Sequence, residues 1–163
     1  MKQIDIKNFI KENKILNNSQ NSIELLVRAI AMLYTKAEKI MDLFFSTFGI
    51  TTAQYNILAL LAEDNGTVNQ LTISKRMLVS QGNITRILDK LVRAALITRV
   101  EDKQDRRHKC IALTAKGKAL YKKIKPEYDK FLNLLSKPIL EKEQKYTSTV
   151  FVKWLYFLKD FSL

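Results

Sequence analysis

The residues with the strongest chemical signal lie between Lys75 and Lys125, where basic side chains are concentrated. This span holds fifteen Lys and Arg against four acidic residues, a net charge of +11, while the whole chain of 163 residues carries +12. Lys and Arg side chains pair with phosphates, and a charge excess confined to one region indicates a surface that faces a polyanion. Nucleic acid is the class of partner that this distribution favours.

Within this basic span, the stretch 69–93 predicts two helices joined by a tight turn. Asn69 and Ser80 are residue types that cap helix N-termini. The second helix has an apolar stripe, and its opposite face begins with polar side chains whose donors and acceptors can reach base edges in a major groove. These candidate DNA-reading residues are Gln81, Asn83, Thr85 and Arg86. A solvated amphipathic helix would show the same pattern, so the stretch alone does not decide between the two.

A short hairpin is predicted after this pair of helices. Residues 97–101 and 109–114 have strand character, and the seven residues DKQDRRH join them. Like charges at a hairpin tip repel one another, so folding does not explain this loop. Phosphates or a narrow minor groove that receive Arg106 and Arg107 would explain it.

Helices on both sides must position these residues. Apolar residues recur at three-and-four spacing from Ile23 to Phe48, and Gly49 follows as a left-handed stop. A second helix begins at the capping box of Thr51 and Gln54 and ends at 64–66. Thr114 caps a helix that runs to about 135, in which Pro126 predicts a kink or a split. A last apolar helix covers about 140–160, and residues 1–18 are a short helix or a loose arm.

Several classes of function have little support. His108 is the only histidine, and Glu141 and Glu143 look like ordinary helix surface, so we expect no enzyme activity, no cofactor and no metal site. Cys110 is the only cysteine, which excludes an internal disulfide. Its basic neighbours Arg107 and Lys109 would suit a redox switch, although a strand cysteine is more often inert packing. No signal peptide or membrane-spanning run is recognisable, so we expect a cytoplasmic protein without a membrane partner.

The run from Leu71 to Gly117 resembles the MarR family of winged helix-turn-helix transcription regulators. The matching pieces are LTISKRMLVSQGNITRILDKL at 71–91, LITR at 96–99, DRR at 105–107 and LTAKG at 113–117. The resemblance implies a mainly α fold with a small β-hairpin wing, divided into three parts. These are an N-terminal arm and long dimerisation helix (1–48), a winged helix-turn-helix DNA-binding domain (49–114) and C-terminal dimerisation helices (115–163).

The resemblance also implies roles. It implies a homodimer on double-stranded DNA with a pseudo-palindromic operator, acting as a repressor that responds to an aromatic or anionic small molecule. Arg107, beside Arg106, looks like the arginine that enters the minor groove, and Asp105 looks like the acid that holds the wing. By position, the residues that fall where the family touches bases and phosphates are Ser80, Gln81, Asn83, Thr85 and Arg86. One departure is Ala95, where many members have Gly.

Two questions stay open at this point. A non-specific architectural DNA-binding protein would explain the charge equally well, since phosphate contacts carry most sequence-independent affinity. The aromatic residues Phe44, Phe45, Phe48 and Tyr55 either line an effector pocket or belong to the core.

Overall fold

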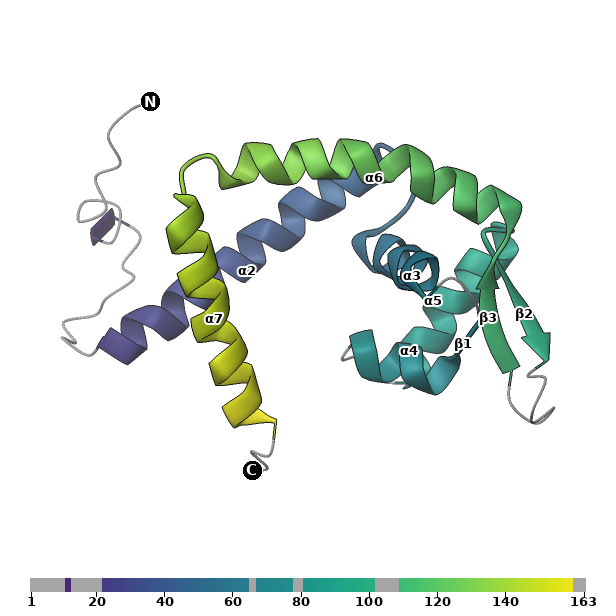
Figure 1. Ribbon diagram of the computed structural model, residues 1–163, viewed down its shortest axis with the longest axis horizontal. Helices are drawn as coiled ribbons and strands as arrows, with labels where there is room; N and C mark the ends of the chain where they lie inside the picture. The colour runs from purple at the N-terminus through teal and green to yellow at the C-terminus, as the bar shows by residue number, and fades with distance from the viewer. Residues whose placement is uncertain (1–10, 13–21, 65–66, 78–80, 102–108, 160–163) are drawn as a thin grey trace.

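The computed structural model describes residues 11–12, 22–64, 67–77, 81–101 and 109–159, and the fold is mainly α-helical with a small antiparallel sheet, as predicted (Figure 1). The helices are α2 (Ser22–Ser46), α3 (Thr52–Glu63), α4 (Gln70–Met77), α5 (Gln81–Arg93), α6 (Ala115–Ser136) and α7 (Glu141–Leu158). The strands are β1 (Val68–Asn69), β2 (Ile97–Glu101) and β3 (Lys109–Leu113). We call α3, α4, α5 and the three strands the winged domain. The predicted arm at 1–18 lies outside the described residues except for 11–12.

The winged domain packs around one hydrophobic core. Ile57 and Leu58 of α3 meet Ile84 and Leu88 of α5, and all four are fully buried. Burying one Leu or Ile side chain stabilises a fold by roughly 1.5–3 kcal/mol. The apolar stripe of α5 therefore fixes which face of that helix points outward.

The sheet has three strands, in the order β1–β3–β2. The predicted hairpin of β2 and β3 is present, but the prediction missed a third strand. This strand, β1, has two residues and pairs Val68 with Ile111. Two residues are too few to show the alternation that identifies a strand in a sequence. Asn69 also caps α4 as predicted, since its Oδ1 accepts a hydrogen bond from the Thr72 amide at 2.7 Å.

The turn between α2 and α3 follows the predicted chemistry. Gly49 adopts φ +72°, so it is the left-handed stop, although α2 itself ends at Ser46, two residues before the predicted end. The Thr51 hydroxyl accepts from the Gln54 amide at 3.3 Å, and the Gln54 side chain accepts from the Thr51 amide at 2.9 Å. This reciprocal box fixes where α3 begins.

An aromatic cluster ties α2, α3 and α6 together. Phe45 stacks on Tyr55 at 4.4 Å between ring centroids, and Phe44 stacks on Phe131 at 4.5 Å. Tyr128 lies 5.0 Å from Tyr55 and 5.1 Å from Phe45. Such ring pairs contribute about 0.5–1.5 kcal/mol beyond the area they bury. The cluster therefore fixes α2 and α6 on the winged domain, and these aromatic residues act as core.

Helix α6 is continuous from Ala115 to Ser136, so of the two outcomes predicted at Pro126, a kink or a split, the split is wrong. Pro126 lies on the exposed side of α6. Buried Ile124 and half-buried Tyr128 hold the chain to the core on either side of the proline. Packing thus overrides the local preference.

The remaining helices form an arm away from the winged domain. In Figure 1, α6 spans the top of the molecule, and α7 descends beside the first part of α2 at the end opposite the sheet. No residue of α7 is buried, although its exposed side chains include Val152, Leu155 and Phe157. Searched over the described residues, the helices include none with the length and apolar character needed to cross a bilayer.

Candidate nucleic-acid interface

Helices α4 and α5 form the two halves of a helix-turn-helix. Ile73 of α4 and Ile84 and Leu88 of α5 are fully buried, so the two helices share the core. The Gln70 side-chain amide donates a hydrogen bond to the Thr85 hydroxyl at 2.7 Å. This bond joins the first residue of α4 to the second turn of α5 and fixes their relative rotation.

The outward face of α5 carries polar and basic side chains. Asn83, Arg86, Lys90 and Arg93 are exposed, while Ile84, Leu88 and Leu91 are buried. Because the buried residues recur every three or four positions, the exposed ones share a second face. An amide and a guanidinium near the start of such a helix have the donor geometry that base edges require.

The predicted DNA-reading residues have different surroundings. Asn83 and Arg86 are exposed on α5, whereas Thr85 is half-buried and bonded to Gln70. Gln81 begins α5 but its side chain lies outside the described residues, as does Ser80 entirely. The structure thus brings Asn83 and Arg86 together on one face and gives Thr85 an intramolecular partner. Sequence reasoning missed Gln70, because spacing alone does not reveal a bond across a turn.

The wing is built on a regular hairpin. Strands β2 and β3 pair over their full length, from Ile97 opposite Leu113 to Glu101 opposite Lys109. The connection between these paired ends is the basic loop 102–108. The predicted wing residues Asp105, Arg106 and Arg107 belong to this loop and lie outside the described residues.

Two arginines of the basic span form ion pairs within the protein. Nη1 of Arg76, in α4, donates to both carboxylate oxygens of Asp64, at 2.7 and 2.9 Å, and this pair connects α4 to the end of α3. Arg99 of β2 pairs with Asp89 of α5 and so links the wing to the helix. Exposed pairs of this kind contribute about 0–1 kcal/mol, so their value here is in orientation.

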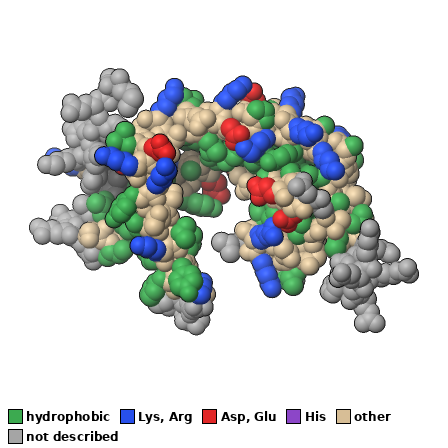
Figure 2. Space-filling view, in the orientation of Figure 1, with side chains coloured by type: hydrophobic (Ala, Val, Ile, Leu, Met, Phe, Trp, Pro, Cys, Tyr) green, Lys and Arg blue, Asp and Glu red, His purple; other side chains and the backbone are tan. Residues whose placement is uncertain are grey.

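Basic side chains also lie away from α5. Figure 2 shows Lys and Arg side chains along the upper edge of the molecule, over α6, as well as at the lower end of the winged domain. The first three turns of α6 contain Lys116, Lys118, Lys122, Lys123 and Lys125. The charge excess is therefore shared between two surfaces, which the sequence did not reveal.

Cys110 lies on β3 with only 5% of its surface exposed. It pairs with Val100 on one side and Asn69 on the other. Oxidation of a thiol requires access to the oxidant as well as a thiolate. Burial in the middle strand favours the packing interpretation over the redox switch.

Comparison with known proteins gives a consistent result. A model of the MarR family matches residues 48–108. The HTH-type transcriptional regulator PapX of Escherichia coli is 32% identical, with 64% of this chain and 68% of that protein covered. An uncharacterized HTH-type transcriptional regulator of Bacillus cereus is 30% identical, with 77% of this chain and 83% of that protein covered.

Solved structures are similar over most of the chain. The S. aureus MepR–DNA complex has a TM-score of 0.74 at 25% identity and covers 88% of this chain and all of that one. A mutant MarR from E. coli complexed with operator DNA has a TM-score of 0.76 at 25% identity, covering 85% of this chain and 99% of that one. The similarity extends beyond the winged domain to the helical arm.

Proposed function

Since this chain belongs to the MarR family and is a DNA-binding transcriptional regulator, we propose that it acts as a homodimeric repressor on a pseudo-palindromic operator. The observation that best supports this proposal is the outward face of α5. Asn83 and Arg86 are exposed on it, while the opposite face of the helix is buried in the core. Asn makes bidentate contacts with adenine, and Arg makes them with guanine or with phosphate. We assign base contacts to these two residues.

The other predicted contacts keep distinct roles in the proposal. Ser80 and Gln81, at the start of α5, contact the DNA backbone, since helix N-termini favour anions. Thr85 acts mainly through its bond to Gln70, by fixing the rotation of α5. Arg106 and Arg107 enter the flanking minor groove, and Asp105 stabilises the wing. The support for the wing roles is the basic loop sequence on a regular hairpin.

A second copy of the chain covers the helical arm. Val27 and Ile30 of α2 and Phe151, Trp154, Leu155 and Leu158 of α7 line an apolar hollow of about 400 Å³, which we call the arm hollow. Monomeric proteins rarely leave a contiguous apolar surface of this kind in water. The same helices in a partner chain would bury it. Two α5 helices in such a dimer would enter major grooves about 34 Å apart.

Similarity to the two DNA complexes supports duplex DNA as the partner of this chain. Both proteins were solved with DNA, one of them with an operator, and their folds match over 88% and 85% of this chain. We therefore propose operator binding, with no catalytic activity. Repression follows if the operator overlaps a promoter, and a small-molecule effector would release it by favouring a different spacing of the α5 helices.

Selection of DNA fragments bound by the full chain tests the proposal. The best fragment and a scrambled version are then compared by fluorescence anisotropy at one salt concentration. We expect two half-sites and at least about a thousandfold tighter binding to the selected site. Asn83→Ala should reduce this ratio, whereas Lys137→Ala, on the far end of α6, should leave it unchanged. A ratio close to one would instead establish a non-specific architectural DNA-binding protein.

The dimer is tested separately by sedimentation. The full chain should sediment as a dimer, and a chain that ends after Thr149, without most of the apolar part of α7, should be monomeric or aggregated. A soluble dimer of the shortened chain with unchanged DNA binding would show that α7 does not form the interface.

A further inference from the structure

The first half of α6 carries a dense group of lysines away from the outward face of α5. Residues 115–125 contain five lysines and no acidic residue. These are Lys116, Lys118, Lys122, Lys123 and Lys125, and all five are exposed.

The lysines stand on both sides of a line of small, uncharged side chains. Gly117 and Ile124 are buried, so the opposite side of the helix faces outward. At about 3.6 residues per turn, Ala115, Ala119 and Pro126 lie along that outward line, and all three are exposed. By the same spacing, the lysines on one side of the line are Lys118, Lys122 and Lys125, and those on the other are Lys116 and Lys123. We call the line and its five lysines the lysine ridge.

Folding does not explain the lysine ridge. Cations near the N-terminus of a helix oppose the helix dipole, and the first turn of α6 has no acidic residue to offset them. Lys118 and Lys122, four positions apart, also repel each other. Neutral side chains would suit the helix better, so the concentration of charge indicates a partner with the opposite charge.

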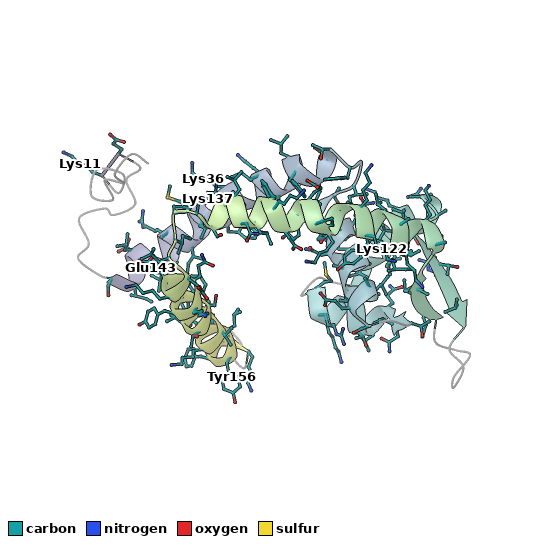
Figure 3. The ribbon with its side chains drawn as sticks, turned by 45° about the horizontal axis from the view of Figure 1, so that its top comes forward. Lys11, Lys36, Lys122, Lys137, Glu143 and Tyr156 are labelled. Atoms are coloured by element: carbon teal, nitrogen blue, oxygen red, sulfur yellow. The ribbon has the colours of Figure 1, made fainter. Side chains whose placement is uncertain are left out.

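Most of this charge is not neutralised within the protein. Lys116 donates to a backbone carbonyl and Lys125 contacts a carboxylate. Within the described part of the chain, Lys118, Lys122 and Lys123 form no ion pair. Figure 3 places Lys122 where α6 crosses the winged domain. These three ammonium groups are therefore available to an anionic partner.

The lysine ridge lies on the opposite side of the winged domain from the helix-turn-helix and the wing. In Figure 1, α6 crosses the top of this domain, whereas α4 and the open ends of the β2–β3 hairpin lie at the bottom. Figure 2 shows basic side chains at both edges. One straight duplex held by the helix-turn-helix and the wing would therefore not reach the ridge.

The shape of the lysine ridge fits the major groove of B-form DNA. A helix is about 10–12 Å across, and this groove is about 12 Å wide. Small side chains along the outward line allow the helix to enter, while lysines on both sides reach the two phosphate backbones. Alanine and proline side chains offer no hydrogen bonds to base edges, so such a contact is independent of sequence. The major groove of duplex RNA is deep and narrow, and side chains cannot read it.

We propose that the lysine ridge binds a second segment of duplex DNA without regard to sequence, so that one protein connects two segments. A protein held on its operator keeps the ridge at a high effective concentration near other parts of the same DNA molecule. The connection rests on the proposed function for its first segment, whereas the affinity of the ridge for DNA does not.

A two-duplex capture assay tests the connection. A biotinylated operator duplex on streptavidin beads is saturated with the full chain and washed, and a fluorescent duplex of unrelated sequence is added. Lys118→Gln/Lys122→Gln/Lys123→Gln should retain at least fivefold less fluorescent duplex than the wild type, with operator affinity within twofold. Unchanged retention would overturn the proposal, and so would a parallel loss of operator affinity, because the two surfaces would then not be separate.

A second triple variant controls for net charge. Lys137→Gln/Lys142→Gln/Lys153→Gln removes three exposed charges from the end of α6 and from α7. It should change retention less than twofold, and equal losses in the two triple variants would reveal only a long-range effect of charge. Because the ridge lysines oppose the helix dipole, the Tm of their triple variant should equal or exceed that of the wild type. A lower Tm would give these lysines a structural role and overturn the assignment.

Ala119 tests the outward line itself. Ala119→Glu places a carboxylate between the lysines and should lower retention at least tenfold. Ala119→Gln has a side chain of the same size without the charge and should lower it less than Ala119→Glu does. Equal retention by Ala119→Glu and the wild type would show that DNA does not approach this line.

Competitors identify the partner. Unlabelled duplex DNA should displace the fluorescent duplex, whereas duplex RNA of equal length and polyglutamate of equal charge should compete at least tenfold more weakly. Equal competition by RNA or by polyglutamate would overturn duplex DNA as the partner, in favour of RNA or of an acidic protein.

Failure of the proposed function gives a different result. If selection yields no preferred operator, the assay is run with an unrelated duplex on the beads. Retention that still depends on the ridge lysines would leave the ridge in place without an operator. Specific operator binding without retention of a second duplex would overturn the ridge alone.

Discussion

The α-carbon of Gly117 lies against the backbone carbonyl of Leu96, so that a Cβ at position 117 would stand 2.0 Å from the Leu96 oxygen. This approach joins the first turn of α6 to Leu96, in the turn between α5 and β2. The Thr114 hydroxyl accepts from the Gly117 amide at 3.0 Å and donates to the Ala95 carbonyl at 2.7 Å. The turn after α5 and the start of α6 therefore meet through backbone contacts with little room to adjust.

Gly117→Ala should destabilise the fold. The added methyl group meets a carbonyl oxygen rather than a flexible side chain, so either α6 or the end of α5 must shift. Forcing one extra carbon into a packed site costs about 1–3 kcal/mol. Urea denaturation of the full chain at a fixed protein concentration would measure the loss in free energy of unfolding.

Gly82→Ala is the matched control for this substitution. Gly82 lies in α5, and a Cβ built there has no neighbour within 4 Å. Alanine in an open helical position stabilises a fold by roughly 0.5–1 kcal/mol relative to glycine. Equal destabilisation by the two substitutions would show that the Leu96 contact is not what requires glycine at 117.

Ala95→Gly should stabilise the protein. Ala95 has φ +57°, and a left-handed residue with a Cβ costs on the order of 1 kcal/mol relative to glycine. Thermal and urea unfolding should show a gain of about that size. Ala94→Gly, one residue earlier in the same turn, should lower stability, because there the glycine only adds freedom to the unfolded chain. A loss of stability with Ala95→Gly would contradict the strain argument.

The sequence predicted local structure well where one residue type has one role. The cap at Thr114 and the stop at Gly49 both follow from backbone chemistry that a neighbouring segment does not alter. The sequence-based prediction failed where contacts between residues far apart in the chain determine the secondary structure. Strand β1 exists because β3 offers it a partner, and α6 continues through Pro126 because residues on both sides are packed.

The side-chain hydrogen bonds and ion pairs within the candidate site could also not be predicted from the sequence. The bond between Gln70 and Thr85 spans fifteen positions across a turn, and no spacing rule identifies it. Net charge showed where the basic residues are concentrated but not that they divide between α5 and α6. The structure shows that Arg76 and Arg99 form ion pairs with Asp64 and Asp89, whereas Arg86 is exposed on the outward face of α5.

A double-mutant cycle on Gln70 and Thr85 would separate positioning from DNA contact. Gln70→Leu and Thr85→Val should each destabilise the fold by about 0.5–1.5 kcal/mol, and the double variant should lose less than the sum because both remove one hydrogen bond. Each single variant should weaken operator binding to a similar extent. If Thr85→Val alone weakened DNA binding while Gln70→Leu did not, Thr85 would contact DNA directly.

Stability should fall in alkali because of Tyr55. Burial raises the pKa of the Tyr55 phenol well above its ordinary value, and burial also raises the pKa of Tyr128. The unfolded phenol loses its proton near pH 10 while the folded one keeps it, so the stabilisation is complete below about pH 10 and is lost as the pH rises further. The slope is up to about 1.4 kcal/mol per pH unit for one such group.

Tyr55→Phe should flatten this alkaline loss, as measured by urea unfolding at several pH values from about 8 to 11. Tyr146→Phe removes the same hydroxyl from a ring that is 74% exposed and should leave the profile unchanged. If both variants retained the wild-type slope, other groups would account for the alkaline sensitivity.

Arg107→Ala should weaken operator binding without unfolding the protein. If Arg107 enters the minor groove, its loss removes one displaced counterion, and the slope of log affinity against log salt should fall by about one unit. Anisotropy titrations at four or more salt concentrations would measure this slope, with circular dichroism to confirm the fold. Lys137→Ala removes one positive charge from the exposed end of α6 and should leave the slope unchanged. A slope that is the same in wild type and Arg107→Ala would show that the wing arginine does not contact DNA, and the minor-groove role would then have to pass to Arg106 or be abandoned.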